Sequence, residues 1–247
     1  MMKIIKSIDK GVAILNCFYD HESLSLVEIT NLTSFSKSST FDILNTLVVN
    51  NLLVQDPISK KYSLGIKNLE LGSLYRTRNP LTKIALPYCE QLQRNYQTTV
   101  HLTIPDRGNV VYIGKFEDYN HSVSLSYIGN RLPMSCTGVG KAMLAFLGEE
   151  YLQKYILINP LPTPTPKSIQ NEEALRADLS KIRENGYAID DEEMVEGLKC
   201  IAAPIFNSNH DVVGAISVSK LTPAMTDEIL PNIIKDVVAA AESISKR

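Results

Sequence analysis

The sequence contains no long apolar run. Nowhere among its 247 residues do about 18 apolar side chains follow one another, which is the length that a membrane-spanning helix requires. The first ten residues are interrupted by charge every few positions and lack the apolar stretch of a secretory signal. We therefore expect a cytoplasmic protein without a membrane partner. Hydrophobic residues still make up 44% of the chain, enough for the cores of two domains.

Metal-binding and disulfide patterns are also missing. The four cysteines are widely scattered, none forms a C-x-x-C pair, and none has a histidine at metal-ligand spacing. A cytoplasmic chain of this length is not expected to carry a disulfide framework. We expect reduced core thiols, surface imidazoles, no metal and no cofactor. These residues are Cys17, Cys89, Cys136, Cys200, His21, His101, His121 and His210.

The chain has no excess of charge of one sign. Its net charge is −2, and residues 1–64 hold six lysines against six acidic residues. Bulk charge thus gives no sign of a polyanionic partner. Any DNA binding has to be argued from the arrangement of residues.

What the N-terminal part does contain is a series of three helical patterns. Apolar residues recur at helical spacing over 7–19, and Ser25 with Glu28 forms a capping box for a short second helix. Residues 33–35 make a tight connection, and Ser36 caps a third helix to about Asn50. The apolar stripe of the first helix is Ile4, Ile8, Val12, Leu15 and Phe18.

Two short extended segments follow, over 52–56 and 61–64, around a turn rich in Pro and Ser. Three helices and a hairpin, with a very short connection between helices two and three, are typical of a winged helix-turn-helix. We expect this domain over residues 1–64, with double-stranded operator DNA as its partner.

The remainder of the chain predicts a linker helix over 65–78 and an α+β domain over 79–247. Strands are expected at 99–104, 110–116, 123–128, 201–206 and 212–219, and helices at 81–96, 138–147, 172–185 and 226–246.

The third helix begins with four hydroxyl residues and one lysine. Free backbone N–H groups and the helix dipole at such an end suit phosphate oxygens, and in a helix-turn-helix these residues meet base edges in the major groove. An ordinary capped helix with a serine-rich first turn is the alternative. The expected DNA contacts are Ser36, Lys37, Ser38, Ser39 and Thr40, with Lys60 and Lys61 from the hairpin tip.

Residues 36–47 resemble the recognition helix of the IclR family of bacterial regulators, and Tyr62-Ser63-Leu64-Gly65 with Leu71-Gly72 is similar to its wing-to-linker junction. Ser36 stands where the family often has proline, and Asp42 where it usually has a basic residue. An aspartate cannot bind a phosphate; it could accept a hydrogen bond from a cytosine amino group or hold a neighbouring lysine. Asp42 is therefore added to the expected DNA contacts.

The resemblance continues through the glycine-rich stretch 129–142 and through 186–205, and covers about residues 6–245. It implies a C-terminal GAF/profilin-like α+β domain that binds a small organic acid effector. It also implies homodimers joined through the N-terminal region and linker, often paired into homotetramers, and most often repression.

Within that domain, Ser217 and Ser219 project from one face of a strand, and Leu198 and Cys200 from one face of another. The resemblance adds Gly138, Val139 and Asp190, and the combined set looks most like glyoxylate-responsive members. Alternatives stay open: Cys200, Ser217 and Ser219 could be core filler, and Asp190 could belong to a solvated acidic run.

Three other functions have weaker support in the sequence. Gly138-Val139-Gly140-Lys141 lacks the glycine and the Ser or Thr that a phosphate-binding P-loop requires, since Ser135 and Ala142 stand there. An enzyme could use Cys200 as a nucleophile with His101 or His210, although nothing in the sequence brings them together. A sensing protein that has lost DNA binding is the third alternative, favoured by Asp42 and the neutral charge balance.

Overall fold

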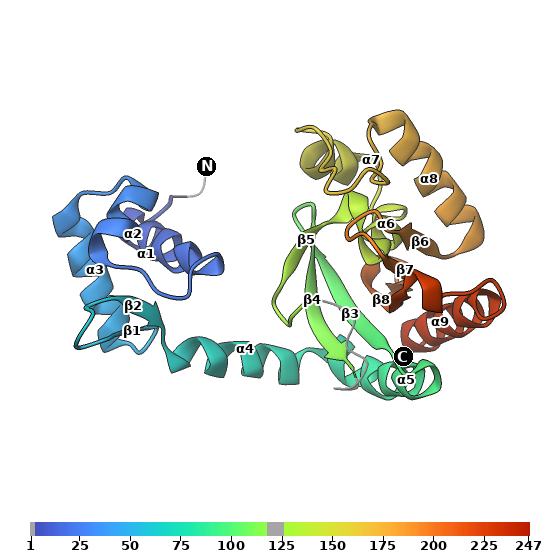
Figure 1. Ribbon diagram of the computed structural model, residues 1–247, viewed down its shortest axis with the longest axis horizontal. Helices are drawn as coiled ribbons and strands as arrows, with labels where there is room; N and C mark the ends of the chain where they lie inside the picture. Colours follow the sequence, from blue (N-terminus) through green and yellow to red (C-terminus); the bar gives the residue numbers. More distant parts are fainter. Residues whose placement is uncertain (1–2, 118–125) are drawn as a thin grey trace. The chain divides into compact units, whose positions relative to one another are not determined.

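The computed structural model describes residues 3–117 and 126–247 and separates into two compact units, Met1–Thr77 and Arg78–Arg247 (Figure 1). The first unit has one hydrophobic core and the second has two, one on each face of its sheet. Of the helices that the structure describes, none is both long and apolar enough to span a bilayer.

The first unit is a three-helix cluster followed by an antiparallel hairpin, which confirms the predicted winged helix-turn-helix. Strand β1 pairs with β2 in the register Leu53↔Leu64. The elements are α1 (Lys6–Asn16) with a 3₁₀ turn at Cys17–Tyr19, α2 (Leu26–Thr33), α3 (Lys37–Val49), β1 (Leu53–Gln55), β2 (Tyr62–Leu64) and α4 (Ile66–Arg78).

Local sequence explains the ends of these helices. The Ser25 hydroxyl accepts from the Glu28 backbone N–H while the Glu28 carboxylate accepts from the Ser25 N–H, the reciprocal pair that the capping box predicted. Ser34 then takes a left-handed conformation with φ 56°, which turns the chain sharply between α2 and α3. The Ser36 hydroxyl caps α3 by accepting from the Ser39 N–H.

The apolar stripe expected on α1 is only partly buried. Ile8 and Val12 are 63% and 51% exposed, whereas Ile14 and Phe18 reach the core. Gly11 lies on this neighbouring face and is buried opposite Ile43 of α3. The outer stripe of α1, which includes Ile8 and Val12, is not buried by any other residue that the structure describes.

The second unit is a six-stranded antiparallel sheet with the order β5-β4-β3-β8-β7-β6, which confirms the predicted α+β class. Its elements are α5 (Pro80–Tyr96), β3 (Thr99–Asp106), β4 (Asn109–Phe116), β5 (Arg131–Pro133), a 3₁₀ turn at Met134–Cys136, α6 (Gly138–Leu144), α7 (Glu149–Tyr151), a π-helical turn at Leu152–Ile156, α8 (Glu172–Asn185), β6 (Ala188–Asp191), β7 (Leu198–Phe206), β8 (Val212–Leu221), a 3₁₀ turn at Thr222–Ala224 and α9 (Leu230–Ser245).

Helices cover both faces of this sheet (Figure 1). On one face α5 and α9 pack against side chains that include Val100, Ile201 and Ile216. On the other face α6 and α8 enclose a second core with Tyr112 and Ala202. Each face of the sheet thus packs against its own core, and successive residues of a strand point alternately into one core and the other.

Several sequence-based expectations need correction here. A strand was predicted over 123–128; residues 123–125 lie outside the described residues, and Ser126–Ile128 are not a strand. The last helix begins at Leu230 rather than at 226, and α6 ends at Leu144 rather than 147. Strand β6 was not predicted. His101, expected on the surface, is 4% exposed because it lies on the inner face of β3.

Candidate effector pocket and nucleic-acid interface

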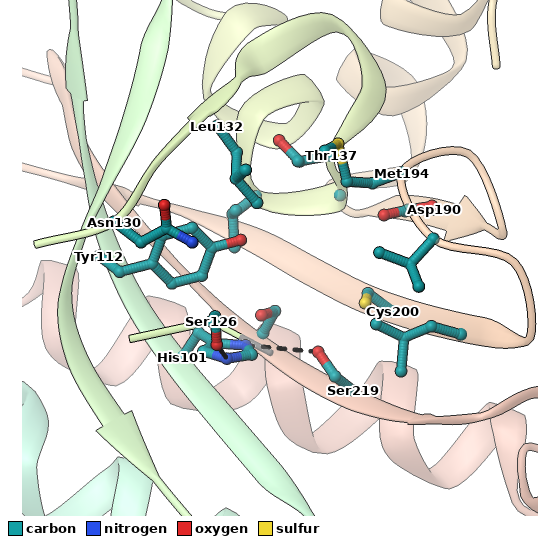
Figure 2. A pocket seen from close by; sticks show the side chains of 15 residues that line it. His101, Tyr112, Ser126, Asn130, Leu132, Thr137, Asp190, Met194, Cys200 and Ser219 are labelled. Carbon is teal, nitrogen blue, oxygen red and sulfur yellow. Dashed lines mark hydrogen bonds between the residues drawn. The ribbon is translucent and has the colours of Figure 1, made fainter. Parts of the chain in front are cut away.

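A cavity of about 220 Å³ lies in the second unit between the sheet and α6 (Figure 2). In liquid water this volume would hold about seven molecules, at roughly 30 Å³ each. It is lined by His101, Tyr112, Ser126, Asn130, Leu132, Thr137, Gly138, Val139, Asp190, Met194, Val195, Leu198, Cys200, Ser217 and Ser219.

Strand register brings the polar side chains of this cavity together. Asp190 pairs with Cys200 across β6 and β7, and Cys200 pairs with Ser219 across β7 and β8. Two residues before Ser219 in β8, Ser217 pairs with His101 of β3. Because paired residues point to the same face of a sheet, these five side chains are directed toward α6 and form the polar floor of the cavity.

The glycine turn at the start of α6 forms the opposite wall. A Cβ at Gly140 would lie 2.3 Å from the Met134 carbonyl oxygen, so the turn can close only without a side chain there. The Thr137 hydroxyl accepts from the Gly140 N–H and donates to the Pro133 carbonyl. This pair of hydrogen bonds fixes the turn against the sheet, with Gly138 and Val139 facing the cavity.

Asp190 is the buried acid of the cavity, 4% exposed. Its Oδ1 accepts from the Glu193 backbone N–H at 2.8 Å. Burial, assisted by the charge of Glu193, raises the pKa of Asp190 to about 7, although the hydrogen bond from the Glu193 N–H and the charge of Lys141 oppose this. Near neutral pH the carboxyl group is therefore present in both protonation states, and the acid form can donate a hydrogen bond.

A buried ion cluster stands behind the cavity. Lys141 of α6 is 1% exposed, and its Nζ lies 2.5 Å from Glu193 Oε1 and 2.9 Å from Asp178 Oδ2. Burial alone would lower the pKa of Lys141, but the two carboxylates outweigh it and the pKa is raised. The ammonium stays charged and ties the 190–195 segment to α6 and α8.

His101 is neutral in this setting. Its Nε2 is hydrogen-bonded to Ser126 Oγ at 2.7 Å and its Nδ1 to Ser219 Oγ at 3.4 Å, as Figure 2 shows. Burial, with the nearby charge of Lys115, lowers its pKa to about 3. No lysine or arginine is found among the described residues that line the cavity.

The seven residues named from the sequence for the effector all line this one cavity, but their role toward a ligand stays a prediction. Sequence reasoning missed His101, Tyr112, Ser126 and Asn130. Only the pairing of β3 with β8 would have pointed to His101, and the sequence does not give strand order.

The geometry does not favour the enzymatic alternative. Cys200 and His101 line the same cavity, but the imidazole is bonded to Ser219 and Ser126. Burial, with the charge of Asp190, raises the pKa of the Cys200 thiol, which disfavours the thiolate form that a nucleophile requires.

In the first unit, the predicted DNA contacts lie in unequal environments. Lys37, Ser38 and Asp42 are exposed on α3. The prediction for Thr40 is wrong: its side chain is fully buried and its hydroxyl donates to the Ser36 carbonyl, so it cannot reach DNA. Ser39 is half-buried and accepts from Lys10 Nζ at 3.2 Å.

Two further predicted contacts lie on the hairpin. Lys60 is exposed at its turn, with φ 59°. The Lys61 ammonium lies 3.7 Å from the Glu28 carboxylate of α2, which pairs the wing with the helix before α3. Ser36 is exposed and already serves as the cap of α3.

Comparison with known proteins matches both units to one family. The IclR helix-turn-helix domain matches residues 7–57, and the bacterial transcriptional regulator IclR C-terminal domain matches residues 74–246. The HTH-type transcriptional regulator XynR of Escherichia coli K12 is 34% identical over 99% of this chain and 98% of its own.

Solved structures give the same result. The IclR protein of Thermotoga maritima aligns with a TM-score of 0.76 and 30% identity over 98% of both chains. An IclR homologue of Microbacterium hydrocarbonoxydans, solved with 4-hydroxybenzoate, has the same fold with a TM-score of 0.82 at 24% identity, over 97% of this chain and 98% of its own. The chain therefore belongs to the IclR family of bacterial transcriptional regulators, DNA-binding proteins with an effector-binding C-terminal domain rather than enzymes.

Proposed function

We propose that this regulator acts in the cytoplasm as a repressor of genes adjoining its operator, and that a small organic acid in the cavity of the second unit controls its DNA affinity. The observation that carries this proposal is the cavity itself. It combines a fixed glycine turn, a buried carboxyl group that can donate a hydrogen bond, and two serine hydroxyls on one strand face. Few precisely placed polar groups in a small enclosed space are typical of a metabolite site.

The acid would be held without a salt bridge. Its carboxylate accepts from the glycine turn at Gly138 and Val139 and from Asp190 in the acid form, while Ser217 and Ser219 bind its oxo or hydroxyl group. Leu198 and Cys200 supply apolar contact. The cavity admits small acids, and the resemblance in its polar residues favours acids of the glyoxylate type.

The DNA side of the function rests on α3 and the wing. Lys37 and Ser38 are placed at the exposed start of α3, where phosphate and base contacts are made in helix-turn-helix proteins. Ser36, Ser39, Asp42, Lys60 and Lys61 complete the proposed contact set.

We further propose a homodimer joined through the first unit, with homotetramers formed by pairing of dimers. The outer stripe of α1 is exposed, and α4 buries none of its side chains even though Leu69 and Leu71 are large and apolar. Such apolar faces support self-association. An effector that favours one arrangement of the paired recognition helices by about 1.4 kcal/mol changes operator affinity about tenfold.

The test uses the full-length protein. Calorimetry with glyoxylate, pyruvate, gluconate and 4-hydroxybenzoate should find at least one acid that binds, and that acid should shift binding to the chain's own upstream region in a gel-shift titration. The matched variants are Ser217→Ala, inside the cavity, and Ser208→Ala, outside it. The proposal is overturned if none of the acids binds, or if Ser217→Ala leaves the affinity of the bound acid unchanged.

A further inference from the structure

The outward face of α3 carries two side chains that the predicted DNA contacts did not include. The inward face is formed by Thr40, Leu44 and Leu47, which are buried. The residues opposite are exposed and follow helical spacing, so they form one continuous surface strip. This strip consists of Ser38, Phe41, Asp42, Asn45 and Val49.

Phe41 is the first of the two. Its ring is 47% exposed although it lies one turn from the buried Leu44. It stands between Lys37, one turn before it, and Asn45, one turn after it, so a partner that contacts either of these also meets the ring. An aromatic side chain within a polar strip of this kind matches the thymine methyl group, the apolar feature of the major groove.

Asn45 is the second. Polar side chains near it form hydrogen bonds with backbone carbonyls of the helix: the Thr46 hydroxyl donates to the Asp42 carbonyl at 2.9 Å, and the Asn50 amide donates to the Thr46 carbonyl at 2.8 Å. The Asn45 amide makes no hydrogen bond within the described part of the chain, and its side chain is exposed. An asparagine amide can donate to N7 and accept from N6 of adenine at once, which is the standard recognition of that base.

We propose that Phe41 and Asn45 are the specificity-determining residues of this protein: Phe41 packs on a thymine methyl group, and the Asn45 amide forms a bidentate pair with adenine in the major groove. The inference rests on the proposed placement of α3 in that groove. The two residues are one helical turn, or about 6 Å, apart. With base pairs about 3.4 Å apart, each half-site should contain a required thymine and a required adenine within about two base pairs.

The experiment begins with duplexes that the full-length protein selects from a randomised library. Each thymine of the selected site is then replaced by deoxyuridine, which removes only the methyl group, and each adenine by 7-deazaadenine, which removes only N7. Fluorescence anisotropy at fixed salt gives the affinities. A single deoxyuridine in one half-site should weaken binding about fourfold, the effect of one buried methyl group.

The variants assign these losses to residues. Phe41→Ala should bind the thymine and deoxyuridine duplexes equally. Asn45→Ala should lose the preference for adenine over other bases, which in the wild type is between about fivefold and 150-fold. Leu221→Ala removes an exposed apolar side chain from the second unit, away from the strip on α3, and should keep both preferences. Thermal melts check that each variant is folded.

The possible outcomes distinguish failure of the base-reading roles of Phe41 and Asn45 from failure of the proposed DNA-binding function. If no duplex is selected from the library, the DNA-binding role of α3 fails and the inference with it. If duplexes are selected but no deoxyuridine weakens binding, or if Phe41→Ala and Asn45→Ala keep the wild-type preferences, the base-reading roles are wrong while the regulator function stands.

Discussion

The two units hold the side chains of their proposed sites in opposite environments. The strip on α3 is exposed to solvent, whereas Asp190, Ser217 and Ser219 are each at least 96% buried. The contacts of the exposed side chains on α3 therefore depend on the partner that binds there. In the cavity the protein itself sets the protonation state and hydrogen bonding of each group before any ligand arrives. Substitutions on α3 should change binding alone, and those around the cavity should change stability as well.

The largest expected effect tests the buried side of this comparison. Lys141→Met leaves Glu193 and Asp178 facing each other without their cation, and we expect a loss of about 3–5 kcal/mol in the unfolding free energy of the second unit. Urea unfolding followed by circular dichroism measures it. Lys167→Met is the control, because its ammonium also meets a carboxylate, Glu192 at 2.6 Å, but in solvent. Equal losses in both variants would contradict the distinction between the two environments.

The second prediction concerns pH. Burial raises the pKa of Asp190 from its ordinary range to about 7, so the folded protein binds a proton that the unfolded chain releases near pH 4. The stability from this protonation is fully present below about pH 4 and is lost as pH rises through about 7. An acid effector that needs the protonated form should bind about tenfold more weakly at pH 8 than at pH 6.

Asp190→Asn separates this effect from general pH sensitivity, because the amide can donate a hydrogen bond at every pH. Its calorimetric affinity for the bound acid should be nearly constant between pH 6 and pH 8. Asp191→Asn alters the neighbouring carboxyl group, which lies 3.3 Å from Lys199, and should keep the wild-type slope. A wild-type affinity that does not vary with pH would show that Asp190 donates nothing to the ligand.

A third, smaller effect concerns one hydroxyl group. Ser219→Ala removes the partner of His101 Nδ1 and one proposed ligand contact. The loss of a single hydrogen bond of about 1 kcal/mol predicts about fivefold weaker binding of the acid by calorimetry. Ser243→Ala, whose hydroxyl donates to the Ala239 carbonyl of α9, is the control and should leave the affinity unchanged.

How far the sequence predicts this molecule follows from the range of the interactions involved. The caps at Ser25 and Ser36 are local and were found correctly, as was the hairpin. The burial of Thr40 was also readable, because it shares helical spacing with Leu44 and Leu47. By contrast, the place of His101 depends on the pairing of β3 with β8, more than a hundred residues apart.

The ion cluster of Lys141, Asp178 and Glu193 could not be predicted from the sequence either, because its members lie far apart along the chain. Lys141 lies in a glycine-rich motif that does not fit a phosphate-binding loop, and its partners come from α8 and from the segment after β6. Strand β6 is only four residues long and ends in two aspartates, a composition that disfavours strands. Strand β6 forms because it pairs with β7, and no local sequence pattern predicts that pairing.

The smallest expected effect tests the exposed side of the comparison. Lys37 lies at the open end of α3, and as a phosphate contact it carries charge but no base preference. Lys37→Ala should weaken binding to selected and random duplexes by the same factor and reduce the slope of log affinity against log salt by about one. The melting temperature should not change. Lys83→Ala, an exposed lysine of the second unit, is the control. A change in base preference with Lys37→Ala would mean that the start of α3 reads sequence as well as charge, and that Phe41 and Asn45 share that role.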